Sequence, residues 1–372
     1  MKEGWEYKKF ESCLVKVPKQ VQVKSKDYKK TGRFPIVSQE SELISGYWDD
    51  ETIVYKHNEP VIIFGDHTKN IKYIDFDFVV GADGTHILST KDDIIAKYFF
   101  YALKSVKLRN LGYARHYKLL KEKYIPVPPL PEQQRIVDYL DSAFAKIDAM
   151  KANAEKALNE AKALFQASLK EMLEPKEGWE EDTLINVFNF IDYRGATPKK
   201  LQRGVPLVTA KNVKCGYIDY TIKDYISKEE YETRKGRGIS RKGDLLITTE
   251  APLGNVAIAD LDEFSAGQRL ITLQQYDNPK YEFINEFYYY YMLSFPFQKR
   301  INEMATGATA QGIKAKLLKT IIVPIPPLSE QQSIVATLDS LKSKVDRLQE
   351  NYDKISQECD ALKQAILRQV FE

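Results

Sequence analysis

The segment Tyr124-Ile-Pro-Val-Pro-Pro-Leu-Pro-Glu-Gln-Gln-Arg-Ile-Val137 decides how the chain is organised, because it occurs a second time near the end. The second copy is Ile322-Val-Pro-Ile-Pro-Pro-Leu-Ser-Glu-Gln-Gln-Ser-Ile-Val335, 198 residues further on. The match extends backwards, since Lys118-Leu-Leu-Lys121 recurs as Lys316-Leu-Leu-Lys319. Repetition of this kind in a chain of 372 residues indicates an internal duplication into two halves.

A second repeated motif opens each half. Gly4-Trp5-Glu6 recurs as Gly178-Trp179-Glu180, at an offset of 174 instead of 198. The second half therefore carries about 24 extra residues between matched ends. Because the ends are alike and the interiors differ, we expect a duplicated scaffold with two different surfaces. The two Gly-Trp starts are expected to pack each domain.

Each Pro-rich segment is followed by a long stretch without glycine or proline, in which apolar residues recur at steps of three and four. Sustained alternation of this kind predicts coiled-coil helices over 131–174 and 329–372. The seam of the first helix includes Val137, Leu140, Phe144, Ile147, Leu158 and Phe165, and that of the second includes Leu338, Leu341, Val345, Leu348, Ile355 and Leu362.

Connectivity predicts the direction of these helices. The first helix leads from domain one into domain two, so the second must return in order to pair with it. We therefore expect an antiparallel two-helix coiled coil that separates the two domains with pseudo-two-fold symmetry. The alternative, in which each helix lies on its own domain, stays open.

The predicted fold class is α+β, with a mostly antiparallel or mixed sheet in each globular domain. Short β-branched and aromatic runs at 51–56, 60–64, 76–80, 243–249 and 255–259 are typical of strands, and helices are expected over 94–105 and 284–305. The domains are a first target-recognition domain over 1–130, the helix 131–174, a second target-recognition domain over 175–328 and the helix 329–372.

Charge is a weak indicator of partners here. The net charge is only +3, but the two globular segments are net positive and the two helical segments net negative. This distribution is consistent with domains that lie on DNA and helices that face protein.

Polar and basic residues gather in the predicted loops. Arg, Lys, Asn and Gln can bind base edges, and Lys or Arg can neutralise phosphates. The DNA-contact candidates in domain one are Lys29, Lys30, Arg33, Gln39, His67, Lys69, Asn70, Arg115, His116 and Lys118. Those in domain two are Arg194, Thr197, Lys199, Lys200, Lys211, Asn212, Arg234, Lys235, Arg237, Gln268, Arg269, Thr309, Gln311, Lys314 and Lys316.

No motif for catalysis is found in the sequence. It has no phosphate-binding Gly-x-x-x-x-Gly-Lys-Ser/Thr loop, no glycine-rich cofactor fingerprint and no Asn/Asp-Pro-Pro-Tyr/Phe segment of DNA amino-methyltransferases. The four histidines and three cysteines have no metal-site spacing. We expect a protein without catalytic residues, cofactor or metal. Three separate cysteines and a charged start without an apolar core predict a cytoplasmic location.

The two Gly-Trp starts, the two Pro-Pro-Leu-x-Glu-Gln-Gln segments and the two long helices resemble the specificity subunit of type I restriction-modification systems, over the whole chain. The resemblance implies two target-recognition domains that each bind one half of a split, asymmetric DNA site. It also implies two methyltransferase subunits docked on the helices, restriction subunits that join through them, and a role in phage defence. S-adenosylmethionine, ATP and Mg are expected on those partner subunits, and none on this chain.

The resemblance also implies where the partners dock. Carried over to matching positions, the docking residues are Pro128, Pro129, Leu130, Glu132, Gln133, Gln134 and Ile136, and in the second copy Pro326, Pro327, Leu328, Glu330, Gln331, Gln332 and Ile334. Two alternatives remain: a coiled-coil scaffold that brings together non-DNA ligands, and the specificity partner of a fused restriction-methylation enzyme.

Overall fold

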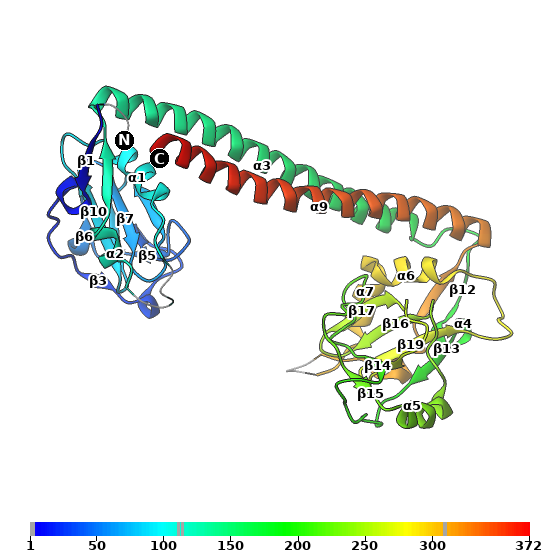
Figure 1. Ribbon diagram of the computed structural model, residues 1–372. Helices are drawn as coiled ribbons and strands as arrows, with labels where there is room; N and C mark the ends of the chain where they lie inside the picture. The colour runs from blue at the N-terminus through cyan, green and yellow to red at the C-terminus, as the bar shows by residue number, and fades with distance from the viewer. Residues whose placement is uncertain (1–3, 110–111, 113–114, 308–310) are drawn as a thin grey trace. The chain divides into compact units, whose positions relative to one another are not determined.

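The computed structural model describes residues 4–109, 112, 115–307 and 311–372. The chain forms two compact units (Figure 1), one of Met1–Glu155 with Tyr352–Glu372 and one of Lys156–Asn351. Each unit contains one globular domain and a part of both long helices. The mixed helix and strand content of both units confirms the α+β class.

The first unit is built on two sheets and a strand pair. One sheet is antiparallel, with strand order β2-β10-β7-β8, and the other is mixed, with order β3-β9-β4-β5 and β6 on β9. Strand bounds are β1 Glu6–Lys9, β2 Leu14–Val15, β3 Gln22–Val23, β4 Phe34–Val37, β5 Gly46–Trp48, β6 Val54–Tyr55, β7 Val61–Gly65, β8 Ile71–Ile74, β9 Phe78–Gly81, β10 Thr85–Thr90 and β11 Tyr124–Val127. Helices are η1 Phe10–Cys13, η2 Ser25–Asp27, η3 Glu51–Ile53, α1 Ala96–Ser105 and α2 Tyr117–Lys121.

The second unit repeats this plan. Its antiparallel sheet has order β13-β19-β16-β17, and its mixed sheet has order β15-β14-β18. Strand bounds are β12 Glu180–Thr183, β13 Phe188–Asp192, β14 Val205–Val208, β15 Tyr225–Ile226, β16 Leu245–Thr249, β17 Leu253–Ile258, β18 Ser265–Ala266, β19 Leu270–Gln275 and β20 Ile322–Ile325. Helices are α4 Leu184–Val187, α5 Lys228–Arg234, η4 Lys235–Arg237, α6 Asn285–Leu293, α7 Phe295–Glu303 and α8 Ala315–Leu318.

The two repeated motifs of each half pair with each other as antiparallel strands. In β1–β11, Glu6 lies opposite Val127, and in β12–β20, Glu180 lies opposite Ile325. The register is the same in both pairs, although the sequence offset is 174 on one strand and 198 on the other. The extra residues of the second half therefore lie in the interior of its domain, between the two paired strands, as the sequence predicts.

Two long helices follow the Pro-rich strands, α3 at Leu130–Met172 and α9 at Leu328–Phe371. Both lie within two residues of the predicted bounds. Within the first unit, Asp148 of α3 bonds Lys363, and Lys151, one turn further on, approaches Asp360 at 4.0 Å. Because the later residue of α3 contacts the earlier residue of α9, the two helices run antiparallel there.

Each unit has a main hydrophobic core that includes both long helices. In the first unit, Ile136 and Leu140 of α3 and Leu367 and Phe371 of α9 pack with α1 and the sheet. In the second unit, Leu169 and Leu173 of α3 join Ile334 and Leu338 of α9. The expectation for the Gly-Trp starts is confirmed, since Trp5 and Trp179 pack on these two cores.

Two element predictions need correction. In the predicted strand 51–56 the first three residues form η3, because Asp50 caps a helical turn by accepting from the Thr52 N–H. The predicted helix 284–305 is two helices, α6 and α7. They are separate because Ser294, which lies between them, has extended backbone.

Candidate functional site

In the second unit, strand topology brings most of the DNA-contact candidates to one edge of the antiparallel sheet. Strands β13 and β16 end at this edge and β19 begins there, because Asp192 lies opposite Ile271 and Thr248 opposite Leu270. The loops after Asp192, after Thr249 and before Leu270 therefore meet. They carry Arg194, Thr197, Lys199, Lys200, Gln268 and Arg269. We call this edge, with the segments bonded to it, the polar edge of the second unit.

Hydrogen bonds attach further segments to this edge. Arg237 Nη1 donates to the Arg194 carbonyl at 2.9 Å, which fixes the turn that also carries Lys235. The Ile313 N–H donates to the Thr249 carbonyl at 2.9 Å, which brings Gln311, Lys314 and Lys316 nearby. The Gly267 N–H donates to the Val208 carbonyl, which places the segment with Lys211 beside Gln268.

The first unit has an equivalent polar edge, where β7 ends at Gly65 opposite Thr85 of β10. Gln39 organises it: Nε2 donates to the Asp83 carbonyl at 3.0 Å, and Oε1 accepts the His67 N–H at 3.1 Å. Its backbone carbonyl accepts from Asn70 Nδ2. The His116 N–H donates to the Asp66 carbonyl, which adds Arg115 and Lys118 to the group.

The remaining candidates of the first unit lie beside the mixed sheet. Lys29 forms an isolated antiparallel β-bridge with Tyr47 through its backbone. Its side chain forms an ion pair with Asp49 at 2.7 Å. The Arg33 N–H donates to the same carboxylate, and the Arg33 guanidinium lies over the Phe34 ring. Lys30 is exposed on the same segment.

Three candidates are corrected, because their side chains are buried and serve the fold. His116 is fully buried, with Nδ1 at 3.0 Å from the Asp66 carbonyl. Asn212 holds its own turn by accepting the Thr209 N–H and donating to two carbonyls. Arg234 donates to Ser265 Oγ and to the Ala196 and Ala266 carbonyls, and lies 4.3 Å from the Tyr193 ring centre. These groups position the polar edge without facing solvent.

Several other candidates form ion pairs with acidic side chains. Arg194 pairs with Asp192, Lys200 with Asp224, Lys235 with Glu232 and Arg269 with Glu250. Exposed ion pairs of this kind are weak and can exchange for phosphates. Thr309 lies outside the described residues.

Sequence reasoning missed one segment of the first polar edge. Residues Lys16, Lys19, Gln20 and Gln22 line a hollow of 530 Å³, next to His86 and Tyr117. The His86 ring stacks on Tyr117 with centroids 4.0 Å apart, and its Nε2 lies 3.3 Å from Asp66 Oδ2. The segment directly follows β2, which runs toward this edge along β10. Its basic and amide composition could have identified it.

The repeated Pro-rich motif divides into exposed and buried members. Pro129, Leu130 and Gln134 are exposed in the first copy, and Pro327 and Gln332 in the second. Pro128, Gln133 and Ile136 are buried, as are Pro326, Gln331 and Ile334. Leu328 is half-buried. The six buried residues cannot form the outer surface of a docking site, so the predicted docking set is corrected to its exposed members.

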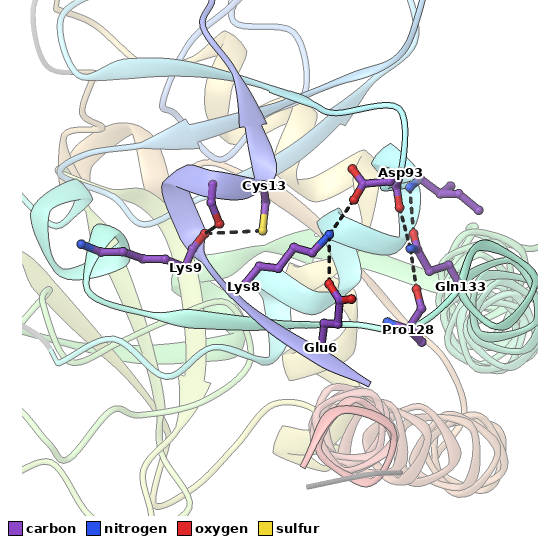
Figure 2. Close-up of polar contacts among 9 residues, drawn as sticks. Glu6, Lys8, Lys9, Cys13, Asp93, Pro128 and Gln133 are labelled. Carbon is purple, nitrogen blue, oxygen red and sulfur yellow. Dashed lines mark hydrogen bonds and ion pairs between the residues drawn. The ribbon is translucent and has the colours of Figure 1, made fainter. Parts of the chain in front are cut away.

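The buried glutamine of each copy forms three hydrogen bonds. Gln133 Nε2 donates to the Asp93 carbonyl at 2.9 Å and the Pro128 carbonyl at 2.8 Å (Figure 2), and Oε1 accepts the Ile95 N–H at 2.9 Å. Gln331 bonds the Glu282 and Pro326 carbonyls and the Ile284 N–H in the same way.

The glutamate of the motif differs between copies. Glu330 accepts from Lys176 Nζ at 2.9 Å and from Trp179 Nε1 at 2.8 Å, and the lysine holds the pKa of its carboxyl below the usual range. Glu132 pairs with Arg135 of its own helix at 2.6 Å. Both glutamates lie in the first helical turn, where a negative charge is favourable.

The described residues contain no group of three or more His, Cys, Asp or Glu placed to hold a metal ion. Among the same residues, no helix combines the length and the apolar character needed to cross a membrane. The three cysteines are free thiols, with Cys13 and Cys359 buried and Cys215 exposed.

Comparison with solved structures shows the same fold. One similar chain was solved in work on complex assembly and conformational transition of the type I restriction-modification system; it has a TM-score of 0.69, 21% identity, and coverage of 100% of this chain and 98% of that one. The crystal structure of the HsdS subunit from Thermoanaerobacter tengcongensis gives a TM-score of 0.55 at 21% identity, with coverage of 100% and 97%.

Sequence comparison leads to the same family. The specificity subunit of the type I restriction enzyme EcoR124I/EcoR124II from Escherichia coli is 27% identical over an alignment of 357 positions, which covers 90% of this chain and 85% of that protein. The model of the type I restriction modification DNA specificity domain matches residues 2–160 and again 176–357. The chain therefore belongs to the family of type I restriction-modification specificity subunits.

Proposed function

We propose that this chain binds a bipartite, asymmetric DNA site, with each globular domain contacting one half of it. The observation that carries the proposal is the pair of polar edges, which form at the same edge of the same sheet in both units. Loops at this edge carry amide and guanidinium groups suited to base edges and ammonium groups suited to phosphates.

The two edges carry different side chains, which is why the proposed site is asymmetric. The first is organised around Gln39, His67 and Asn70, and the second around Arg194, Arg237 and Gln268. Base recognition depends on which donors and acceptors face the groove. Two edges of different chemistry therefore favour two different half-sites.

The proposed spacer is an antiparallel coiled coil of α3 and α9 with pseudo-two-fold symmetry. Its support is the antiparallel pairing inside the first unit and the contact between Lys162 and Gln349 inside the second. In both units, residues further along α3 contact residues earlier in α9. A spacer of this kind would hold the two domains apart at a fixed distance.

The proposed protein partners are two methyltransferase subunits, and through them restriction subunits. Docking is assigned to the exposed members of each Pro-rich motif, above all Leu130 and Gln134 in the first copy and Gln332 in the second. Catalysis, S-adenosylmethionine, ATP and Mg are assigned to the partners, and no catalytic role to this chain. The proposed location is the cytoplasm, which suits three free thiols.

Salt-dependent DNA binding tests this function. The chain is purified from its source cell with the subunits bound to it, and the affinity of the complex for a duplex pool is measured at several salt concentrations. The proposal predicts a linear fall of log affinity with log salt, as phosphate contacts are lost. A complex that binds partners but no DNA would support the scaffold alternative instead. A co-purified fused restriction-methylation enzyme would identify the other alternative.

A further inference from the structure

The second glutamine of each Glu-Gln-Gln motif lies at a joint between the globular domain and its long helix. Gln133 is fully buried, and its three hydrogen bonds reach two segments of the domain. Pro128 directly follows β11 and lies next to Gln133 in Figure 2, while Asp93 and Ile95 belong to the segment that leads into α1. One side chain from the first turn of α3 thus connects the helix to the domain.

Gln331 makes the same joint in the second unit. It is also fully buried, and its partners correspond one by one: Pro326, Glu282 and Ile284 before α6. The preceding glutamates have other partners, since Glu132 pairs with Arg135 and Glu330 bonds Lys176 and Trp179. The following Gln134 is exposed and bonds Asp138 of its own helix. Adjacent, chemically identical residues therefore have separate roles.

Tyrosines reinforce each joint. Tyr98 OH donates to the Pro126 carbonyl, and Tyr101 OH to Asp141 Oδ1 at 2.5 Å. In the second unit, Tyr288 OH donates to the Pro324 carbonyl and Tyr290 OH to Asp339 Oδ1 at 2.6 Å. These contacts join α1 or α6 to the strand and helix, and the glutamine joins all three segments through one side chain.

A glutamine is suited to this task because its amide donates twice and accepts once. A carboxylate cannot donate to the two carbonyls, and an apolar side chain leaves two carbonyls and one N–H without partners. Unmet buried polar groups are costly, so the joint favours one orientation of the segments.

We propose that Gln133 and Gln331 are positioning residues that fix the orientation of each recognition domain on its spacer helix, and thereby set the separation between half-sites that the complex accepts. The inference rests on the proposed bipartite DNA binding. Successive base pairs are about 3.4 Å apart, so a small tilt at a joint is enough to move a distant polar edge by one base pair.

The test uses the complete complex with its methyltransferase subunits and a random-sequence duplex pool. Wild-type, Gln133→Met and Gln331→Met complexes methylate the pool, and sequencing gives the half-sites and their separation. Gln166→Met and Gln357→Met are the matched controls, because they change exposed glutamines of α3 and α9 that lie outside the docking motif. Methionine preserves the length of the side chain and removes its hydrogen bonds.

The buried variants are expected to keep both half-site sequences and to relax the separation. Methylation at separations one base pair from the preferred one should rise roughly 5- to 30-fold relative to wild type, which corresponds to the loss of one or two net hydrogen bonds. The controls should keep a single separation. A role in stability alone would lower the yield of folded complex without changing the preferred separation.

Two results would overturn the inference. One is an assembled Gln133→Met or Gln331→Met complex that keeps the wild-type separation. The other is failure of both variants to assemble while the controls do, because the joint would then serve folding alone. A wild-type complex that shows no split site would instead refute the proposed function, so the two failures are distinguishable.

Discussion

Lys8 and Asp182 occupy the same register position in two equivalent strand pairs, yet they carry opposite charges. Lys8 lies opposite Ile125 in β1–β11, and Asp182 lies opposite Val323 in β12–β20. Each side chain reaches the segment before α1 or α6. Lys8 pairs with Asp93, before α1, at 2.6 Å (Figure 2), and Asp182 pairs with Lys280, before α6, at 2.8 Å. The duplicated fold therefore retains the ion pair but reverses its polarity.

The hydrogen bonds of Asp182 predict a local loss of stability on mutation. Asp182 also accepts from Tyr281 OH at 2.7 Å and Asn186 Nδ2 at 2.7 Å, and its side chain is 14% exposed. Asp182→Asn should lower the free energy of unfolding of the second unit by about 1–3 kcal/mol, mostly through these bonds to a charged acceptor. Urea denaturation measures the change. The exposed Lys280 ammonium should add little.

A double variant tests the reversed polarity directly. Asp182→Lys alone should be more damaging than Asp182→Asn, because it sets two ammonium groups side by side. Adding Lys280→Asp recreates the polarity of the first unit and should recover part of the loss. No recovery in the double variant would show that the two positions are not coupled.

Acid should remove the contribution of Asp182. The hydrogen bonds from Lys280, Asn186 and Tyr281 hold the pKa of its carboxyl far below the usual range. A lowered folded-state pKa contributes stability that is present above the unfolded value near ~3.9 and is lost as pH falls toward the folded value. The stability difference between wild type and Asp182→Asn should therefore be constant from pH 5 to 8 and shrink below about pH 4. A difference that changes mainly between pH 6 and 8 would contradict this assignment.

Docking is expected to depend on Leu130 because its side chain is 44% exposed beside the first Pro-rich motif. Leu130→Asp should weaken one methyltransferase contact about tenfold or more while the chain remains folded. Native mass measurement should then show one partner instead of two. Leu164→Asp is the matched control, since Leu164 is an exposed α3 leucine away from the motif. If the Leu130→Asp variant still binds two partners with unchanged affinity, Leu130 is not part of the docking site.

Ile136→Asp is expected to behave differently from Leu130→Asp. Ile136 is 8% exposed and belongs to the main core of the first unit. A carboxylate there loses solvation without a partner and should destabilise the whole unit. This variant is therefore unsuitable for mapping a docking surface.

Lys314 is the best single test of the second polar edge. It is exposed next to Ile313, whose N–H is bonded to the end of β16. Lys314→Ala should weaken binding to all DNA sequences alike and reduce the slope of log affinity against log salt by about one unit. Lys242→Ala is the control, because Lys242 lies at the opposite edge and pairs with Asp262. Equal effects of the two variants would argue against the assignment of the DNA face.

Much of the architecture could be predicted because segments with the same sequence are expected to form the same structure in both halves. The two helices were predictable from spacing alone, since apolar residues repeat over 40 residues without an interruption by glycine or proline. The pairing of the Gly-Trp start with the Pro-rich strand was not predictable. It is a long-range contact between β1 and β11, which local pattern does not encode.

The site was less predictable, because burial depends on tertiary contacts. Gln133 and Gln134 are adjacent and identical, and only the segment before α1 makes one of them internal. Arg234 has the composition of a DNA contact, but three acceptors from distant segments surround it. Conversely, Lys16 and Gln20 belong to the polar edge because β2 pairs with β10 and directs the chain toward that edge.

Methylation mapping tests the central claim most directly. The chain with its methyltransferase subunits modifies a random-sequence duplex pool in the presence of S-adenosylmethionine, and the modified molecules are sequenced. We predict two different specified half-sites separated by an unspecified spacer of fixed length. A single continuous motif, or two identical half-sites in inverted orientation, would contradict recognition by two different polar edges.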